Sequence, residues 1–303
     1  MSPLRTPFGT VARFGGERTR SLLRFAGARS HLLPRLRGRA SVAAAALAAC
    51  VALGACAGPR SLPTEARTEL APSGTLRAAI NFGNPVLAQK DPATGAARGV
   101  SVDLARELGR RLGVPVELVL FDAAGKVSAA AQEGRWDVAF LAIDPERAAE
   151  IAFTAPYVLI EGTYLVRADS PLRAIADVDR AGVRVAVGNK SAYDLFLART
   201  LRTAQLVRAP TSQASIELFL SERLDAAAGV RQPLMQFAAT HPGLRVLDGR
   251  FMAIEQAMGT PKRNAAGARF LYAFIEEMKA SGFVAQALAR SGQGEATVAP
   301  PAR

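Results

Sequence analysis

Residues that could catalyse a reaction are scarce in this chain after Cys56. His241 is the one histidine in that part, and it stands beside Pro242 and Gly243 in a predicted turn, where a histidine is usually exposed and inert. The chain lacks the G-x-S-x-G, H-E-x-x-H, G-x-G-x-x-G and G-x-x-x-x-G-K-S/T patterns of nucleophile, zinc and nucleotide sites. The residue types therefore favour binding over catalysis, and they indicate neither a metal nor a cofactor.

Two charged residues are candidates for specific chemistry. Glu161 is the one charge in an otherwise mostly apolar predicted strand over residues 157–166. It is the one candidate for a catalytic acid, although an edge position or a pair with an arginine is the favoured interpretation. Arg147 carries a planar guanidinium, which fits a carboxylate with two parallel hydrogen bonds and stays charged at any relevant pH. From residue type alone, a surface arginine in a turn is the alternative to an anion site.

Alternating strand and helix patterns from residue 75 onward must position these side chains. Periodicity predicts strands over residues 76–80, 116–121, 136–141, 157–166, 183–187, 205–207, 224–228, 244–247 and 254–258. It predicts helices over residues 102–112, 124–133, 192–201, 212–220, 231–239, 265–280 and 282–290, the last two capped by Asn264 and Ser281. Two successive βαβ blocks predict an α/β fold with two mostly parallel sheets, each covered by helices. The polar segment 291–303 is predicted to be a disordered tail.

Most of the net charge of +12 is concentrated at the N-terminus. Residues 1–40 hold nine arginines and one acid, so the remainder is only mildly basic and does not indicate a nucleic-acid groove. An apolar run over residues 42–53 follows, too short to span a bilayer, which takes roughly 20 residues. This order predicts a secretory signal peptide with a long basic region over residues 1–55.

The end of the apolar run reads Leu53-Gly54-Ala55-Cys56 and resembles the bacterial lipobox. The resemblance implies a lipid on Cys56, cleavage before it, and a location in the periplasm or on the outer face of the cell membrane. The alternative is that Cys56 is simply a small residue near a signal cleavage site. Residues 56–73 are then predicted to be a lipidated cysteine and a flexible tether.

Segment 144–157 reads D-P-E-R-A-A-E-I-A-F-T-A-P-Y. It resembles the T-x-x-R-x-x-x-I-x-F-S-x-P-Y signature of family 3 extracellular solute-binding proteins, the amino-acid-type receptors of ABC importers. The sequences G-V-S-V-D-L at 99–104, G-R-W-D at 134–137 and L-D-A at 224–226 are similar to further segments of that family. The resemblance covers about residues 74–290.

The resemblance implies a type II periplasmic-binding-protein-like fold, in which two lobes, each a mostly parallel sheet flanked by helices, are joined by a two-strand hinge. Lobe 1 is expected over residues 74–167 plus 252–290, and lobe 2 over residues 168–251. The chain would cross between them near 166–170 and 249–253. A ligand in the cleft would contact both lobes only after the hinge closes.

Three positions match the family's carboxylate site in lobe 1. Arg147 matches the arginine that holds the ligand carboxylate. Leu141 and Ala142 fall where the family places backbone groups and a small hydroxyl, and Ala142 lacks that hydroxyl. Asn81 and Asn84 lie in the first strand-to-helix loop, at the expected mouth of the cleft, although turn chemistry explains them equally well.

The sequence G-N-K-S at 188–191 resembles the lobe 2 loop whose amides and hydroxyl also meet the carboxylate. Lys190 and Ser191 are therefore candidate ligand-binding residues. A predicted helix follows, and the N-terminus of a helix is a natural anion site. Ser191 is equally suited to cap that helix, and the two roles are compatible.

The departures from the family predict an unusual ligand. Amino-acid receptors usually place an Asp just past the second D-A strand to pair with the α-ammonium, whereas Val230 stands there, followed by Arg231 and Gln232. The family's aromatic lids are replaced by Ala124 and Asn84. A buried ammonium without a counter-charge is costly. The expected ligand is therefore an organic acid or an atypical amino-acid derivative without a free α-ammonium.

The predicted function is that of the substrate-binding receptor of an ABC importer, with a small anionic solute and a membrane permease as partners. The protein is expected to be a monomer that touches the membrane through its lipid anchor only and binds no nucleic acid. One alternative is a periplasmic enzyme of the cyclohexadienyl dehydratase type on the same fold, with Glu161 as its acid. A receptor for a signalling partner is the other.

Overall fold

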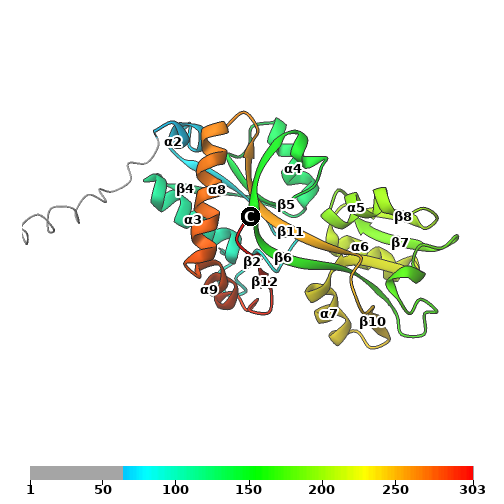
Figure 1. Ribbon diagram of the computed structural model, residues 1–303. Helices are drawn as coiled ribbons and strands as arrows, with labels where there is room; N and C mark the ends of the chain where they lie inside the picture. Colours follow the sequence, from blue (N-terminus) through cyan, green and yellow to red (C-terminus); the bar gives the residue numbers. More distant parts are fainter. Residues whose placement is uncertain (1–63, 303) are drawn as a thin grey trace, which may run out of the picture. The chain divides into compact units, whose positions relative to one another are not determined.

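A mixed β-sheet, with parallel strands toward both ends and antiparallel strands between them, runs through the part of the protein that the computed structural model describes, residues 64–302 (Figure 1). The predicted signal peptide and Cys56 lie outside the described residues. The strands are β1 (Leu76–Asn81), β2 (Gln89–Lys90), β3 (Ala97–Arg98), β4 (Val116–Phe121), β5 (Val138–Ala142), β6 (Ile151–Arg167), β7 (Arg184–Gly188), β8 (Gln205–Ala209), β9 (Ala226–Val230), β10 (Leu244–Val246), β11 (Met252–Pro261) and β12 (Thr297–Val298).

Helices cover both faces of this sheet. They are α2 (Thr64–Leu70), α3 (Val100–Leu112), α4 (Ala124–Gln132), α5 (Ala192–Thr200), α6 (Ser212–Ser221), α7 (Arg231–Thr240), α8 (Ala265–Ala280) and α9 (Phe283–Arg290), with short 3-10 turns η1 (Arg147–Ala149) and η2 (Ile175–Asp177). The sequence-based limits of most elements are right to within a few residues. None of the helices in residues 64–302 combines the length and apolar character needed to cross a membrane.

The strand order β4-β1-β5-β11-β6-β9-β7-β8 has a parallel group at each end. In what we call the first half, β1 pairs in parallel with β4 and β5. In the second half, β7 pairs in parallel with β8 and β9. The predicted α/β class with parallel strands and covering helices is confirmed.

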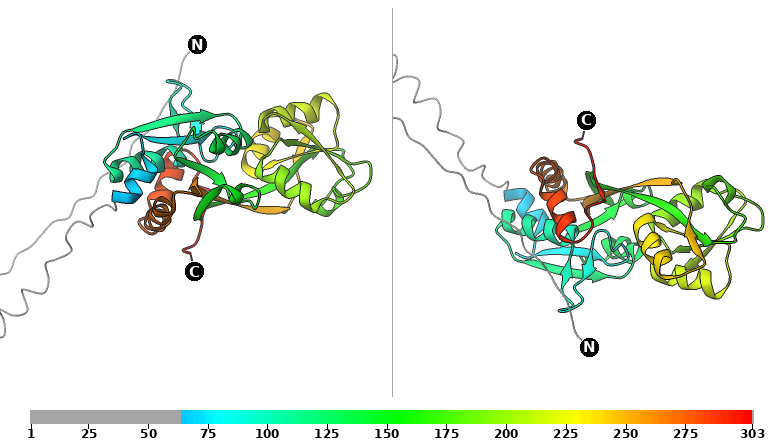
Figure 2. Two further views of the ribbon diagram at one scale, coloured as in Figure 1. Left: turned by 90° about the horizontal axis from the view of Figure 1, so that it is seen from above. Right: turned by 90° about the horizontal axis from the view of Figure 1, so that it is seen from below.

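Two long antiparallel strands, β6 and β11, join the halves. β6 has 17 residues and pairs with β11 over residues 151–162 and with β9 over residues 162–165. Because this one strand serves both halves, its hydrogen bonding makes one continuous sheet where two separate sheets were predicted. Figure 2 shows β6 and β11 passing from one half to the other in both views. The lobe limits themselves stay a prediction.

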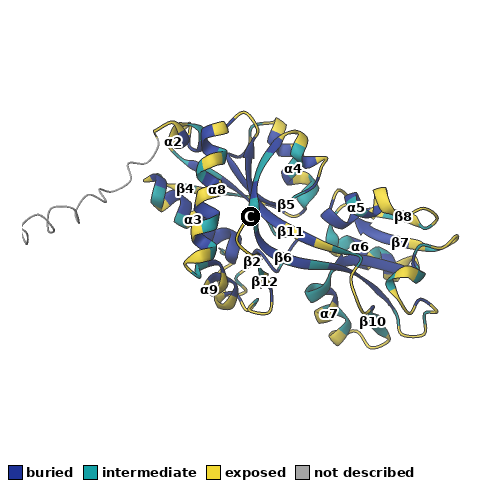
Figure 3. Cartoon of the chain, viewed as in Figure 1, coloured by how far each residue is buried: buried dark blue, intermediate teal, exposed yellow. Residues whose placement is uncertain are grey.

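Alternating side chains from each strand build separate cores on the two faces of the sheet. In the first half, Ala78 and Ile80 pack on the α3 and α8 side, whereas Ala79 and Leu141 pack with α4. The second half repeats this arrangement, with one core beneath α5 and another beneath α6 and α7. Figure 3 shows the resulting buried sheet between helices whose outer faces are exposed.

The predicted flexible tether is wrong for residues 64–70, which form the packed helix α2. Leu70 is fully buried, and the Glu69 carboxylate accepts a hydrogen bond of 2.7 Å from the Gly267 amide at the start of α8. A Cβ on Gly267 would lie 2.8 Å from Leu70 Cδ2, so the glycine permits the close approach. A carboxylate at a helix N-terminus is favourable, which explains why this segment packs there.

The predicted disordered tail is wrong for most of residues 291–302. β12 pairs antiparallel with β6 at Val158 and Leu159, and the Ala299 amide donates to the Tyr157 carbonyl at 3.0 Å. These β6 residues pair with β11 on their other side, so the tail satisfies backbone groups that would otherwise lack partners.

The two predicted helix caps are also corrected. Asn264 occupies the N-cap of α8, but its side-chain amide donates to the Glu69 carbonyl and to Thr260 Oγ1 and does not cap the helix. The N-cap of α9 is Gly282, not Ser281.

Candidate functional site

Arg147 lies in the turn between the buried strand β5 and the long strand β6, and its side chain is buried. Its Nη1 donates to the Ala142 carbonyl at 2.9 Å, at the end of β5. Its Nη2 donates to the Lys190 carbonyl at 2.9 Å, in the loop before α5 of the second half. Its Nε is buried and has no hydrogen-bond partner among the described residues.

The guanidinium of Arg147 has no carboxylate partner in residues 64–302. The two acids whose charges act on it are paired with other cations. Asp144 binds Arg199 at 2.7 Å, and Glu146 binds Lys190 Nζ at 2.8 Å. A buried charge without a counter-charge is costly, so this site is suited to an anion from outside.

Burial lowers the pKa of Arg147 to about 10, while the nearby charges of Asp144 and Glu146 act in the opposite direction. A pKa of about 10 still leaves the side chain protonated near neutral pH. The group therefore keeps its positive charge inside a dry environment, where electrostatic attraction to an anion is strong.

A small cavity of about 40 Å³ lies against Arg147, and both halves of the sheet line it. Its lining residues are Asn81, Gly83, Asn84, Ala124, Leu141, Ala142, Arg147, Ser191, Ala192, Tyr193, Ser212, Val230, Ile254 and Gln256. Seven predicted site residues are thus brought together: Asn81, Asn84, Leu141, Ala142, Arg147, Ser191 and Val230. No Asp or Glu is among the lining residues, so Arg147 supplies the cavity's one formal charge.

The asparagines at this cavity also form turns, as the alternative interpretation required. Asn81 Oδ1 accepts a hydrogen bond from the Gly83 amide at 2.9 Å, and Asn84 Oδ1 accepts one from the Val86 amide at 3.3 Å. Both residues therefore shape the loop after β1, and a direct role in binding stays a prediction.

Ser191 caps helix α5, since its Oγ accepts a hydrogen bond from the Asp194 amide at 3.0 Å. The preceding Lys190 has a φ of 56°, a left-handed conformation that is uncommon for a residue with a side chain. Its amide donates to Asp194 Oδ2 at 2.8 Å, and this bond helps to hold the loop. The turn aims the Lys190 carbonyl at Arg147.

Two predicted site residues have side chains directed elsewhere. The Lys190 ammonium pairs with Glu146 and lines a different cavity beside Gly125, which Arg147 also borders, and the Lys190 backbone carbonyl accepts a hydrogen bond from Arg147. Arg231 is absent from the lining of the Arg147 cavity. Its guanidinium pairs with Glu161 at 2.6 Å and also donates to the Gly249 carbonyl.

Glu161 is thereby explained as a partner of arginines. Arg231 and Arg250 contact its two carboxylate oxygens at 2.6 and 2.9 Å. The hydrogen bond from Arg231, followed by that from Arg250, lowers the pKa of Glu161 below its usual range. A carboxylate held in its ionised form is a poor general acid, and Glu161 does not line the Arg147 cavity.

Sequence reasoning missed three polar residues of the cavity. Gln256 in β11 is 5% exposed and lines the cavity. Tyr193 donates to Ser212 Oγ at 2.8 Å, which links α5 to the start of α6. A lone amide inside the apolar β11 sequence was the available signal for Gln256, whereas nothing local marks Tyr193 or Ser212.

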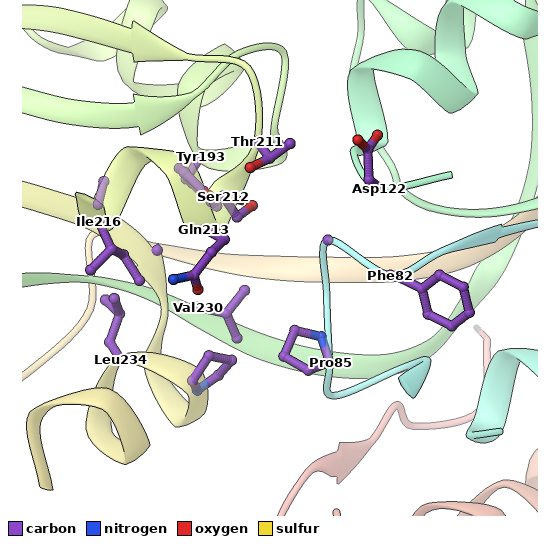
Figure 4. Close-up of a pocket in the computed structure, with 14 residues that line it drawn as sticks. Phe82, Pro85, Asp122, Tyr193, Thr211, Ser212, Gln213, Ile216, Val230 and Leu234 are labelled. Atoms are coloured by element: carbon purple, nitrogen blue, oxygen red, sulfur yellow. Dashed lines mark hydrogen bonds between the residues drawn. The ribbon is translucent and has the colours of Figure 1, made fainter. Parts of the chain in front are cut away.

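A second cavity of about 300 Å³ adjoins the first (Figure 4). The two share Gly83, Tyr193, Ser212 and Val230. The larger cavity extends toward α6 and α7, so the candidate site consists of a small charged end and a wider remainder. Within residues 64–302, no group of three or more His, Cys, Asp or Glu side chains could hold a metal ion.

Residues 76–292 match the model of the bacterial extracellular solute-binding proteins, family 3. The chain belongs to this family. This membership confirms the predicted resemblance. The chain is therefore a solute-binding protein of a family that takes part in transport. No curated protein matches the sequence.

Solved structures of several amino-acid-binding proteins share the fold. A mutant of ArgBP from T. maritima has a TM-score of 0.65 and 23% identity, over 75% of this chain and 99% of that one. AbpA from Streptococcus pneumoniae, bound to L-arginine, has a TM-score of 0.65 and 21% identity, over 74% of this chain and 97% of that one. AncCDT-1, an ancestral amino-acid-binding protein and precursor of cyclohexadienyl dehydratase, has a TM-score of 0.62 and 23% identity, over 74% of this chain and 97% of that one. At these identities the likeness shows the fold alone.

Proposed function

We propose that this family 3 protein is the receptor of an ABC importer and captures a small carboxylate-bearing solute that has no free α-ammonium. The observation that carries the proposal is the Arg147 guanidinium, which is buried, has an unpartnered Nε and lacks an ion pair within residues 64–302. A carboxylate at this position would supply both the missing acceptor and the missing charge.

The rest of the small cavity supports the absence of an ammonium. Val230 occupies the position where amino-acid receptors of this family usually have an Asp, and the cavity lining contains no acid. An α-ammonium placed there would be buried beside a guanidinium, and the like charges would repel each other. Organic acids, including keto and hydroxy acids, avoid this cost.

Capture is proposed to work by closure of the two halves on the solute. The lining includes Arg147 and Asn81 from the first half and Ser191 from the second. A solute that bridges such walls stabilises the closed arrangement by the difference in its affinity for the two states.

The deciding experiment measures thermal unfolding of the purified chain with a panel of organic acids and a panel of amino acids. We expect several organic acids to raise the unfolding temperature, because a bound ligand stabilises the folded state. Arg147→Gln should abolish these shifts, whereas Arg180→Gln, at an exposed arginine, should leave them intact. Shifts with standard α-amino acids alone would contradict the proposal.

The alternative of a periplasmic dehydratase is less well supported, because Glu161 is engaged by two arginines and lies outside the cavity lining. Turnover of a cyclohexadienyl substrate that Glu161→Gln abolishes would favour it. A signalling receptor stays a second alternative, which neighbouring genes for a permease and an ATPase would disfavour. We further propose that Cys56 anchors the monomeric protein in the periplasm or on the outer face of the cell membrane.

A further inference from the structure

We propose that the solute is an amphipathic monocarboxylate, whose apolar chain or ring occupies the larger cavity beside the Arg147 cavity. This inference rests on the proposed function, because it assigns the carboxylate to Arg147 and then asks what the remainder of the molecule must be.

The first support is that the two cavities are neighbours. Gly83, Tyr193, Ser212 and Val230 line both of them, so a molecule held at Arg147 lies next to the larger space. Gly83 has no room for a side chain, since an added Cβ would lie 2.8 Å from the Asp122 carbonyl. The glycine therefore permits the close approach of the loop after β1 to Asp122, at a place that borders both cavities.

The second support is the apolar lining of the larger cavity. Nine of its lining residues carry no polar side-chain atom: Phe82, Pro85, Ile216, Ala228, Val230, Pro233, Leu234 and the two glycines Gly83 and Gly229. Figure 4 shows Ile216, Val230 and Leu234 along one side of the space, with Pro85 on the other. When the hydrocarbon part of a ligand displaces water from such a surface, the free energy of binding becomes more favourable.

The third support is that each polar side chain of this lining already takes part in at least one hydrogen bond. Tyr193 donates to Ser212 Oγ at 2.8 Å, and Thr211 Oγ1 accepts from the Ala214 amide at 3.0 Å. The Gln213 side-chain amide donates to Glu217 at 3.1 Å. A polar ligand group would therefore have to compete with existing hydrogen bonds, and an apolar group would not.

The fourth support concerns charge. Asp122 is the one charged residue among those that line the larger cavity. Its side chain is 58% exposed and pairs with Lys126 Nζ at 2.8 Å, so it belongs to the solvent-facing rim. A cationic tail would thus find no buried counter-charge, and an uncharged tail fits the site best.

The test is calorimetric titration of the purified full chain with four matched probes. Propanoate and hexanoate share the carboxylate and differ in tail length, hexanamide lacks the charge, and L-norleucine adds an α-ammonium to the hexanoate skeleton. Each buried methylene strengthens binding by roughly fourfold, the equivalent of about 0.8 kcal/mol, so hexanoate should bind at least ~10-fold more tightly than propanoate.

Two variants test the location of the tail. Leu234→Thr and Ile216→Thr each place a hydroxyl in the larger cavity and outside the Arg147 cavity, and either should weaken hexanoate binding by at least ~5-fold with little effect on propanoate. Met235→Thr alters an exposed side chain on the same helix as Leu234, outside the cavity lining, and should change neither affinity. Thermal unfolding without ligand verifies that each variant is folded.

Equal affinities for propanoate and hexanoate, or a hexanoate preference that both cavity variants retain, would overturn the inference and leave the carboxylate site intact. Hexanamide binding as tightly as hexanoate, or norleucine binding more tightly, would overturn the proposed function instead. A chain that binds none of the four probes would contradict both.

Discussion

The two acids whose charges act on Arg147 each have a cation of their own, and this distribution of partners sets the character of the site. Asp144 binds Arg199 and Glu146 binds Lys190, so neither neutralises the buried guanidinium. The family resemblance predicts that Val230 stands where amino-acid receptors usually have a further acid, which pairs with the ligand ammonium. A cavity with one positive charge and no negative one should therefore select anions over zwitterions.

Replacing Val230 with Asp should reverse this selectivity. The new carboxylate would pair with an α-ammonium and repel a carboxylate-only ligand, so norleucine binding should appear and hexanoate binding should weaken by at least ~10-fold. Isothermal titration of both ligands measures the change. Val230→Asn, of matched shape without the charge, should not gain norleucine binding, and equal gains in the two variants would rule out the electrostatic explanation.

At the scale of elements, strands β5, β9 and β11 supply the wall of the site, and β6 pairs with two of them. β5 ends at Ala142, β9 at Val230, and β11 presents Gln256 between them, so three strands of one sheet supply parts of the same wall. The tail strand β12 pairs with β6 close to the place where β6 changes partners. Next to the junction between the halves, β6 is therefore hydrogen-bonded along both of its edges, to β11 and to β12.

Helix α3 is tied to α8 by a charged network that should make stability depend on pH. Glu107 accepts hydrogen bonds from Arg110 and Arg111, and Arg111 also binds Glu277 of α8 at 2.6 Å. These bonds, the one from Arg110 first, lower the pKa of Glu107 from 4.5 to about 2. Because the folded state favours the ionised carboxylate, its contribution is present above about pH 4.5 and is lost as the pH falls toward 2.

We therefore expect Glu107→Gln to reduce the free energy of unfolding by about 1 kcal/mol near pH 7, a modest value because Arg110 is 71% exposed and screened by solvent. In urea denaturation, the difference in the free energy of unfolding between wild type and variant should become smaller as the pH falls below about 4.5. We call this difference the gap. Glu65→Gln, on the exposed side of α2, serves as the control and should show almost no gap. A pH-independent gap would exclude the titration of Glu107 as its cause.

At the scale of the whole described body, polar contacts join the two halves beside the cavity. Arg199 of α5 reaches Asp144 of the first half at 2.7 Å, and Lys190 reaches Glu146 at 2.8 Å. The halves approach closely here, since a Cβ on Gly125 would lie 2.7 Å from Lys190 Cβ. These contacts favour the arrangement in which Arg147 is covered.

Arg199→Gln should shift the protein away from this arrangement. The substitution leaves the buried Asp144 carboxylate without its cation, a cost of about 1 kcal/mol that weakens hexanoate binding roughly fivefold. Calorimetry measures the affinity, and small-angle X-ray scattering should report a larger radius of gyration at equal ligand concentration. Arg202→Gln provides a neighbouring arginine control, and unchanged scattering and affinity in Arg199→Gln would refute the role of this contact.

The sequence by itself determined the local structure and the family. Alternation predicted β4 and most other elements closely, since side-chain periodicity reflects which face of an element is buried. The 144–157 signature identified Arg147 as a candidate anion ligand, and Val230 in place of an Asp led to the prediction, still to be tested, that the ligand has no free α-ammonium. Each of these features can be read within a short stretch of residues.

Only the tertiary structure decided which distant groups become neighbours. It placed Arg231 on Glu161 and not in the cavity, joined two expected sheets through β6, and folded α2 and the tail onto the body. It also brought Gln256, Tyr193 and Ser212 to the cavity wall. The physical reason is that a side chain's partner is set by strand order and helix packing between segments far apart in the chain, which local patterns do not encode.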